Sequence, residues 1–311
     1  MWLKNLLLYR INFEIPPDTE SLERSLAAYA FLPCSAHDQR AIGWVSPFGN
    51  EQAPLVHAAN SNLLLTVRQE EKLLPAAVIK QALQQRLDQW QEATGGRLTQ
   101  TKKQALREQI ISQLLPRAFS RFQEIRIWID SRNALLAVDT PSFHKAETTL
   151  ALLRQSLGTL SVIPWIQSPS ITPLLTQWVA TQALPEGFQL QEEAELRSMQ
   201  AGGGVIRCKQ QPLDSDEIAG HLAANKQVTQ LALNWKQQIQ FILTEDGRFK
   251  RLKYADSLQT ADQIAADDRQ QRLDADFVLA TAALSELLQA LKPLLSSTAH
   301  PIENSPTASA H

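Results

Sequence analysis

Apolar and polar residues along the chain follow two periodicities, one typical of strands and one typical of helices. The mostly apolar run at residues 62–69 predicts a strand that ends where the chain turns polar at Glu70-Glu71-Lys72. After Asp18, helical spacing places Leu22, Leu26 and Tyr29 on one helix face. Further strands are predicted at residues 2–11, 43–45, 122–130, 134–139, 228–234, 239–244 and 249–254, and further helices at 75–90, 99–115, 142–157 and 276–294. These elements predict an α+β fold of antiparallel sheets with flanking helices.

The two helices predicted at residues 75–90 and 99–115 should form a hairpin that projects from the rest of the chain. The loop at residues 93–96 contains two glycines, and each helix would be roughly 25 Å long. Their apolar positions form a narrow stripe that needs a partner beyond the hairpin itself, and its members are Ile79, Leu83, Leu87, Leu106, Ile110, Ile111 and Leu114.

The order of predicted elements divides the chain into five parts. Strand, strand and helix follow one another in both halves, which suggests an internal duplication. Serine, threonine, proline and alanine dominate the last residues, so a disordered tail is expected there. The parts are an amino-terminal α+β segment at 1–74, the helical hairpin at 75–118, a β-hairpin and helix at 119–165 that complete the first domain, a carboxyl-terminal α+β domain at 166–295, and the tail at 296–311.

Composition narrows the classes of protein to consider. The chain has 311 residues, a net charge of -2 and a pI near 6.3, so it cannot bind a polyanion through total charge and would need an uneven charge distribution. Cys34 and Cys208 are far apart, which predicts two reduced thiols in a cytoplasmic protein. The apolar run at the amino terminus is too short for a signal peptide, and no segment approaches ~20 consecutive apolar residues, so no membrane span is expected.

Positive charge is concentrated in the hairpin and the segment after it. Seven basic residues between Arg97 and Arg126 face only two acids, and an aromatic ring, Phe119, lies among them. Cations spread along a track can bind phosphates, while an exposed ring can stack on a base. The alternative is a solvated helix face with Phe119 in the core. The candidate nucleic-acid contacts here are Lys102, Lys103, Arg107, Arg117, Phe119, Arg121 and Arg126.

A second basic cluster lies in the carboxyl-terminal half. Strand alternation at residues 248–253 would put Arg248, Lys250 and Leu252 on one face and Phe249, Arg251 and Lys253 on the other, so that both faces carry cations. One of these faces should meet solvent or phosphate. The alternative is an edge strand that uses lysine against aggregation. The candidates in this cluster are Lys209, Lys226, Lys236, Arg248, Lys250, Arg251 and Lys253.

Signals for catalysis are weak. Glu70-Glu71-Lys72 contains the Glu-x-Lys triplet of metal-dependent nucleases, but the nearest upstream acid, Glu51, falls in a predicted loop, and an ordinary charged turn is the simpler interpretation. The six histidines show no metal spacing, and Gly202-Gly203-Gly204 lacks the lysine and hydroxyl of a phosphate loop. We therefore expect no enzyme, no metal site and no cofactor.

The chain resembles the RdgC family of bacterial recombination-associated DNA-binding proteins. The similarity extends from the first residues into the last predicted helix, and its motifs are Trp2-Leu3-Lys4-Asn5-Leu6, Phe31-Leu32-Pro33-Cys34, Gly43-Trp44-Val45, Glu70-Glu71-Lys72, residues 78–83, residues 114–122, Trp128-Ile129-Asp130, Ser156-Leu157-Gly158, residues 187–190, residues 203–207, Arg251-Leu252-Lys253 and residues 274–277.

The resemblance implies an α+β homodimer closed into a ring, with duplex DNA passing through a basic central hole without sequence preference. Single-stranded DNA is left open as a further partner. It also implies nucleoid association and restraint of the RecA recombinase through occupied DNA. By the same resemblance, Phe119 lies near the contact between the hairpins, and Lys209 and Lys226 match basic positions of the inner surface. Arg207-Cys208-Lys209 departs from the usual family pattern. A different hypothesis stays open, in which the chain is a protein interaction module that acts directly on RecA or on a replication factor.

Overall fold

The protein is an α+β structure built around two antiparallel sheets, which confirms the fold class predicted from the sequence. The computed structural model describes residues 2–12, 18–50, 52–96, 98–166, 170–200, 202–259 and 269–297. The predicted tail from residue 298 onward lies outside the described residues, as do Pro16, Pro17, Glu51 and Arg97.

The first sheet has the strand order β2-β4-β5-β6-β1-β7, with β3 paired to β4 off this path. Helices α1 (Thr19–Ala27) and α4 (Phe143–Leu157) pack their apolar side chains on one face of it. As predicted, the Asp18 side chain caps α1 by accepting a hydrogen bond from the backbone N–H of Ser21. The strands are β1 (Leu7–Ile11), β2 (Arg40–Val45), β3 (Val56–Ala59), β4 (Asn62–Lys72), β5 (Ser120–Asp130), β6 (Leu135–Val138) and β7 (Val162–Pro164).

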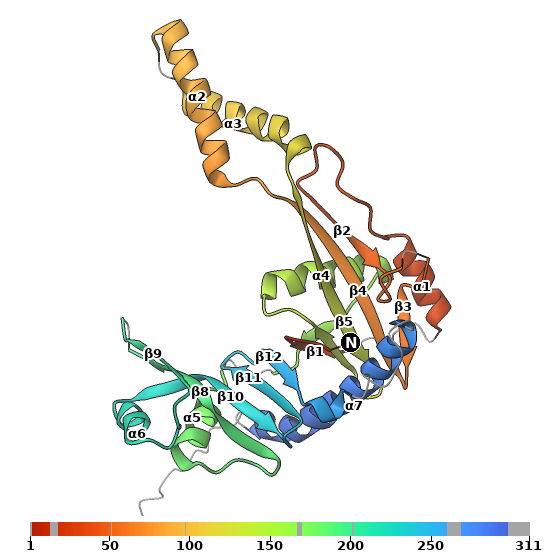
Figure 1. Ribbon diagram of the computed structural model, residues 1–311, viewed down its shortest axis with the longest axis vertical. Coiled ribbons are helices and arrows are strands. Elements are labelled where there is room, and N and C mark those ends of the chain that lie inside the picture. Colours follow the sequence, from red (N-terminus) through yellow and green to blue (C-terminus); the bar gives the residue numbers. More distant parts are fainter. Residues whose placement is uncertain are drawn as a thin grey trace, which may run out of the picture.

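The predicted helical hairpin is present and projects away from the sheets as an arm (Figure 1). Strands β4 and β5 pair along their whole length and carry α2 (Ala76–Thr94), α3 (Gln100–Leu114) and the short 3-10 helix η1 (Leu115–Arg117) at their end. Of the apolar stripe predicted on the arm, only Ile110 is buried, and the other six side chains are half-buried. The two helices therefore leave this stripe incompletely covered within one chain.

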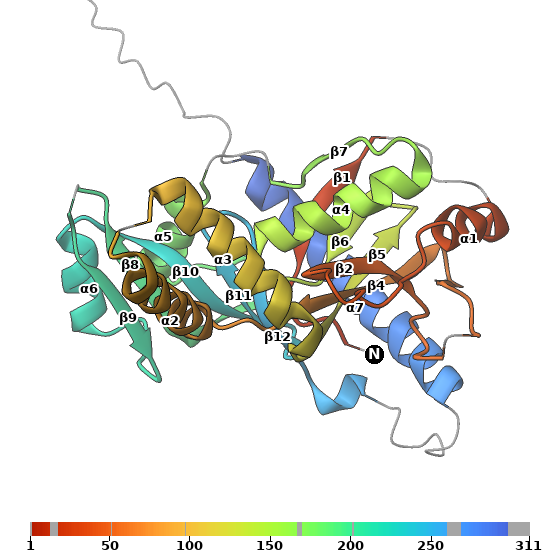
Figure 2. The same cartoon turned by 90° about the horizontal axis from the view of Figure 1, so that it is seen from above.

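The second sheet has the order β12-β11-β10-β8-β9. Helices α5 (Thr172–Thr181) and α6 (Asp216–Ala223) pack against it, and the long helix α7 (Arg269–Ser297) passes between the two halves of the molecule. Seen from the side of the arm, α2 and α3 lie over this sheet (Figure 2). Its strands are β8 (Phe188–Ser198), β9 (Val205–Lys209), β10 (Lys226–Trp235), β11 (Ile239–Thr244) and β12 (Phe249–Tyr254), and a 3-10 helix η2 (Asp256–Leu258) follows.

One hydrophobic cluster joins the two halves. It contains Leu64 and Trp128 from the first sheet, Phe249 from the second, and Leu284 from α7, all fully buried. The backbones of Leu6 and Phe249 also exchange two hydrogen bonds, of 2.8 and 3.0 Å. Apolar burial is therefore continuous across residue 165, where the sequence predicted a boundary between domains.

Several predicted element bounds were wrong. β4 continues through Glu70-Glu71-Lys72, because these residues pair with Ser120–Phe122 of β5 and form the two-stranded ribbon that carries the arm. β1 starts at Leu7, and of residues 2–6 only Leu6 forms a bridge to the second sheet. The polar alternation at residues 188–198 is β8, a signal that the sequence interpretation missed together with α5 and α6.

Helix α7 is long and apolar enough over Gln270–Leu295 to cross a membrane by length and composition alone, which the sequence prediction did not anticipate. In the fold it is a core helix, since Phe277, Leu284, Leu287 and Leu291 are fully buried against both sheets. The apolar composition of α7 is explained by this burial.

Candidate nucleic-acid interface

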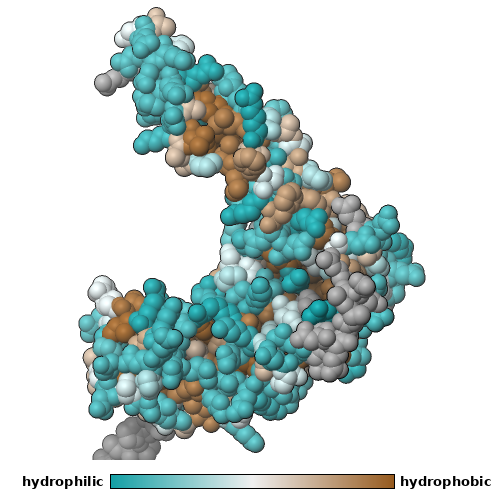
Figure 3. Space-filling view, in the orientation of Figure 1, coloured by the Kyte–Doolittle hydropathy of each residue, from teal (hydrophilic) through white to brown (hydrophobic). Residues whose placement is uncertain are grey.

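An open groove crosses the face of the second sheet that is not covered by helices. Its main cavity, about 600 Å³, is lined by strands β8, β9, β10, β11 and β12 together with Asn5 and Pro141. Alternate residues on these strands, such as Leu231 and Leu243, point the other way into the hydrophobic cluster with α5 and α7. The groove therefore lies on the face of the second sheet that is turned toward the arm (Figure 2), across the hollow that the space-filling view shows (Figure 3). The cations that line this cavity and the adjoining one are Arg207, Lys209, Lys250, Arg251 and Lys253.

A β-bulge in β12 decides which cations reach the groove. The pairs Gln240–Lys253 and Ile242–Lys250 show one extra residue on β12, and Arg251 takes it up with a φ of 52°. The simple alternation predicted for residues 248–253 was therefore wrong. Phe249 and Leu252 both face the core, while Lys250 and Lys253 both line the groove.

The arginines of the groove are bound to carboxylates, whereas its lysines are not. Arg251 pairs with Glu193, and Arg207 pairs with Glu195 at 2.7 Å. Among the described residues, no carboxylate lies within 4.0 Å of the amino group of any groove lysine. Partial burial and the nearby Arg248 guanidinium lower the pKa of Lys250 from its usual value. The groove charges that no carboxylate of the described residues neutralises are therefore the three amino groups of Lys209, Lys250 and Lys253.

Glu195 organises the polar side of the groove. The residue is 4% exposed, and its carboxylate accepts hydrogen bonds from Arg207, Arg197 and Thr229. Burial raises the pKa of this carboxyl, but the hydrogen bond from Arg207 and then that from Thr229 oppose it, so the pKa lies below its usual range. The ionised form is the one that fits the folded state.

We expect Glu195→Gln to lower the free energy of unfolding at pH 7 by about 1–3 kcal/mol, since two arginines lose their charged acceptor. Because the folded-state pKa of Glu195 lies below the unfolded value of about 4.3, its stabilisation is present above that pH and is lost as the pH falls through the folded pKa. Urea unfolding between pH 7 and pH 3 should therefore show a smaller acid-induced loss of stability in the variant. Glu193→Gln, which removes one exposed ion pair, should cost less than about 1 kcal/mol. Equal effects of the two substitutions would contradict this assignment.

Three other candidates of the carboxyl-terminal cluster lie outside the groove. The Lys226 amino group is 3.1 Å from Nδ1 of His221 on α6, and Lys236 pairs with Glu286 on α7 at 2.5 Å. Arg248 pairs with Asp246 at 2.6 Å and stacks over the Phe143 ring at 5.0 Å. The predicted cluster is therefore not one surface, because residues close in sequence lie on different sides of the sheet.

The arm, with Lys102, Lys103 and Arg107 on α3 and Arg117 on η1, lies opposite the second sheet (Figure 1), whereas Arg121 and Arg126 lie on β5. Phe119 is 84% exposed, so the alternative that placed it in the core was wrong. Lys103 and Arg117 are exposed, Lys102 lies over the Trp90 ring at 5.9 Å, and Arg121 pairs with Glu71 at 2.6 Å. In Figure 3, apolar side chains gather on α2 and α3, whereas the facing surface of the second sheet is mainly hydrophilic.

The two glutamates of the Glu-x-Lys triplet bind neighbouring side chains and backbone groups of the first domain. Glu70 is 3% exposed and accepts hydrogen bonds from the hydroxyl of Ser120 at 2.5 Å and the backbone N–H of Cys34 at 2.7 Å, and these two bonds lower its pKa. Both oxygens of Glu71 are bound by Arg40 and Arg121. The interpretation as a turn was wrong, because the triplet is paired strand. Within the described residues, no group of three or more His, Cys, Asp or Glu side chains could hold a metal ion.

Fold and groove together define an α+β protein with a free basic groove beneath a projecting arm. A family model described as "Putative exonuclease, RdgC" matches residues 1–298. The recombination-associated protein RdgC of Serratia proteamaculans is 47% identical over 290 residues, which cover 93% of this chain and 96% of the relative. The proteins of that name from Salmonella paratyphi B and Salmonella typhimurium are each 46% identical over 292 residues, 94% of this chain and 96% of the relative. The chain belongs to the RdgC family.

Proposed function

We propose that this protein binds duplex DNA without sequence preference, through phosphate contacts in the groove of the second sheet, and does not cleave it. One observation supports this most strongly: three lysines that have no carboxylate partner among the described residues line an open groove in a chain whose net charge is -2. Lysine amino groups bind phosphate as point charges and carry little base specificity. Cations gathered on a single concave face explain how a chain of pI near 6.3 can hold a polyanion.

The proposed form is a homodimeric ring that encloses the DNA. The arm carries a half-buried apolar stripe and the exposed ring of Phe119, and a second copy of the same arm would cover both by symmetry. Encirclement requires positive charge only on the inner wall, where the groove lies. Single-stranded DNA would meet the same cations of the groove.

In the cell, the proposed role is a nucleoid-associated cytoplasmic protein that limits RecA-dependent recombination by occupying DNA. The names of the relatives, which refer to recombination, support this role. The alternative is a direct protein contact with RecA or a replication factor, for which the basic groove would serve an acidic partner. The two hypotheses differ in whether loss of DNA binding abolishes inhibition of RecA.

A salt titration of binding tests the proposal. We expect the affinity for unrelated duplexes of equal length to be nearly the same and to fall steeply with salt, with a log-log slope of about -0.9 for each phosphate contacted. Fluorescence anisotropy with labelled duplexes between 50 and 300 mM salt would measure it. Binding that is insensitive to salt, or strongly selective for one sequence, would contradict a phosphate-based clamp.

The same mixtures with magnesium or manganese address the exonuclease description of the family. Glu70 and Glu71, the carboxylates of the nuclease-like triplet, are already bound by Ser120, Cys34 and two arginines, so we expect full-length DNA after incubation. Shortened products that disappear when a chelator is added would show instead that the chain degrades DNA.

A further inference from the structure

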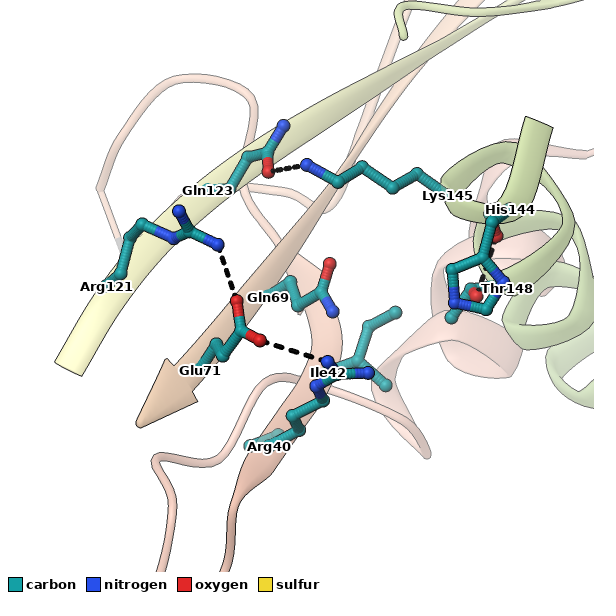
Figure 4. A pocket seen from close by; sticks show the side chains of 10 residues that line it. Arg40, Ile42, Gln69, Glu71, Arg121, Gln123, His144, Lys145 and Thr148 are labelled. Atoms are coloured by element: carbon teal, nitrogen blue, oxygen red, sulfur yellow. Dashed lines mark hydrogen bonds and ion pairs between the residues drawn. The ribbon is translucent and has the colours of Figure 1, made fainter. Parts of the chain in front are cut away.

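A second basic pocket lies in the amino-terminal half, between α4 and the ribbon of β4 and β5 (Figure 4). This α4 pocket has a volume of about 210 Å³, and of its cations the sequence interpretation had singled out only Arg121. Arg40 on β2 and Arg121 on β5 project toward it from one side, and His144 and Lys145 project from the first turn of α4 on the other.

The positively charged side chains that line the α4 pocket outnumber the carboxylates that line it. Among the described residues that line it, Glu71 is the one carboxylate and binds Arg40 at 3.0 Å and Arg121 at 2.6 Å, while the Lys145 amino group donates to the neutral side-chain oxygen of Gln123. The two arginine side chains are 61% and 60% exposed, so most donors of both guanidinium groups remain open. Three cations against one carboxylate, with amide groups beside them, suit an oxyanion, and guanidinium groups bind phosphate oxygens in pairs.

The α4 pocket adjoins the groove through the start of α4. The Arg248 guanidinium donates to the carbonyl oxygen of Pro141 at 3.0 Å and lies over the ring of Phe143. Pro141 lines the groove, and Phe143 directly precedes His144 and Lys145. Arg248 also precedes the groove strand β12 by one residue. Arg248, which also pairs with Asp246, therefore lies at the junction of the two halves, beside the first turn of α4 and next to a residue that lines the groove.

The geometry points to the α4 pocket as a second phosphate site, which binds the backbone of the same DNA duplex that the groove binds. This inference rests on the proposed function and extends it to Arg40, His144 and Lys145. Duplex DNA carries one charge for every ≈ 1.7 Å along its axis, so a backbone that leaves the groove presents further phosphates along the adjoining surface. One chain would then hold the duplex with both of its halves.

The test compares Arg40→Gln/Lys145→Gln with a control of equal charge change, Arg24→Gln/Arg132→Gln. The control arginines are exposed, and among the described residues their side chains donate hydrogen bonds to Ser21 and Ser61, outside the groove and the pocket. We expect the log-log salt slope of the pocket variant to be smaller in magnitude by about 1–2, for one or two lost phosphate contacts, and its affinity at 100 mM salt to fall roughly tenfold. The control should keep the wild-type slope.

A photoreactive amino acid at position 144 separates contact from an indirect effect. It should cross-link to duplex DNA, whereas the same group at Glu20, exposed on α1, should not. An unchanged slope in the pocket variant, or no cross-link from position 144, would overturn the α4 pocket as a phosphate site even where the wild type binds in a salt-dependent manner. Absence of DNA binding by the wild type would overturn the proposed function, and this inference with it.

Discussion

Reversing the charge of the three groove lysines, Lys209→Glu/Lys250→Glu/Lys253→Glu, should weaken DNA binding at 100 mM salt by at least about 100-fold. Each substitution removes one attraction to phosphate and adds one repulsion, and each term is about 1 kcal/mol for charges 4 Å apart in water-like surroundings. None of these amino groups has a carboxylate partner among the described residues, and all three lie on the solvent side of the sheet. The fold should therefore tolerate the change, and the thermal unfolding midpoint should stay within a few degrees of the wild type.

The matched control is Lys226→Glu/Lys236→Glu/Arg132→Glu, which makes the same change in net charge outside the groove. Lys226 and Lys236 lie beside helices α6 and α7, so the control should lose much less affinity. Inhibition of RecA by the groove variant then separates the two functional hypotheses. If inhibition disappears together with DNA binding, the clamp is supported, whereas inhibition that survives favours a direct protein contact. Equal loss of affinity in both variants would contradict a role for the groove.

Phe249→Ala should lower the free energy of unfolding by about 3–5 kcal/mol, the largest stability effect that we expect from a single substitution. Phe249 is 0% exposed, its ring lies 5.2 Å from that of Phe241 and 6.5 Å from that of Trp165, and its backbone pairs with Leu6. The substitution leaves a cavity where the two halves of the molecule meet.

Because one cluster contains buried side chains of both sheets, this loss should shift the unfolding of both halves together. Urea unfolding followed by tryptophan fluorescence and by circular dichroism would measure it, and both signals should move to the same lower midpoint. Lys253→Ala on the same strand, with an exposed side chain, should change the free energy of unfolding by less than about 0.5 kcal/mol. If only one half became less stable in Phe249→Ala, the halves would be independent units.

Much of the local structure was predictable because the residues that determine it are neighbours in sequence. Helical spacing and the glycines after Thr94 were enough to predict the arm, and Asp18 and Ser142 marked the starts of α1 and α4. The strands predicted at residues 239–244 and 249–254 are joined by a tight turn in which Gly247 has a φ of 78°, a conformation that glycine adopts without strain. Strand β8 was also predictable, because apolar and polar residues alternate along its sequence, although the prediction did not include it.

The sequence by itself determined the α+β class, the arm and the local excess of positive charge. Only the tertiary structure decided which cations share a surface. Their grouping depends on the strand order and on a β-bulge at Arg251, which the local sequence pattern did not predict. It also showed that Glu193 and Glu195 neutralise the groove arginines, and that Arg40 and Lys145, far apart in the chain, line one pocket with Arg121. The physical reason is that electrostatic interactions depend on distance in space, and the order of residues along a chain does not fix that distance before the strands are paired.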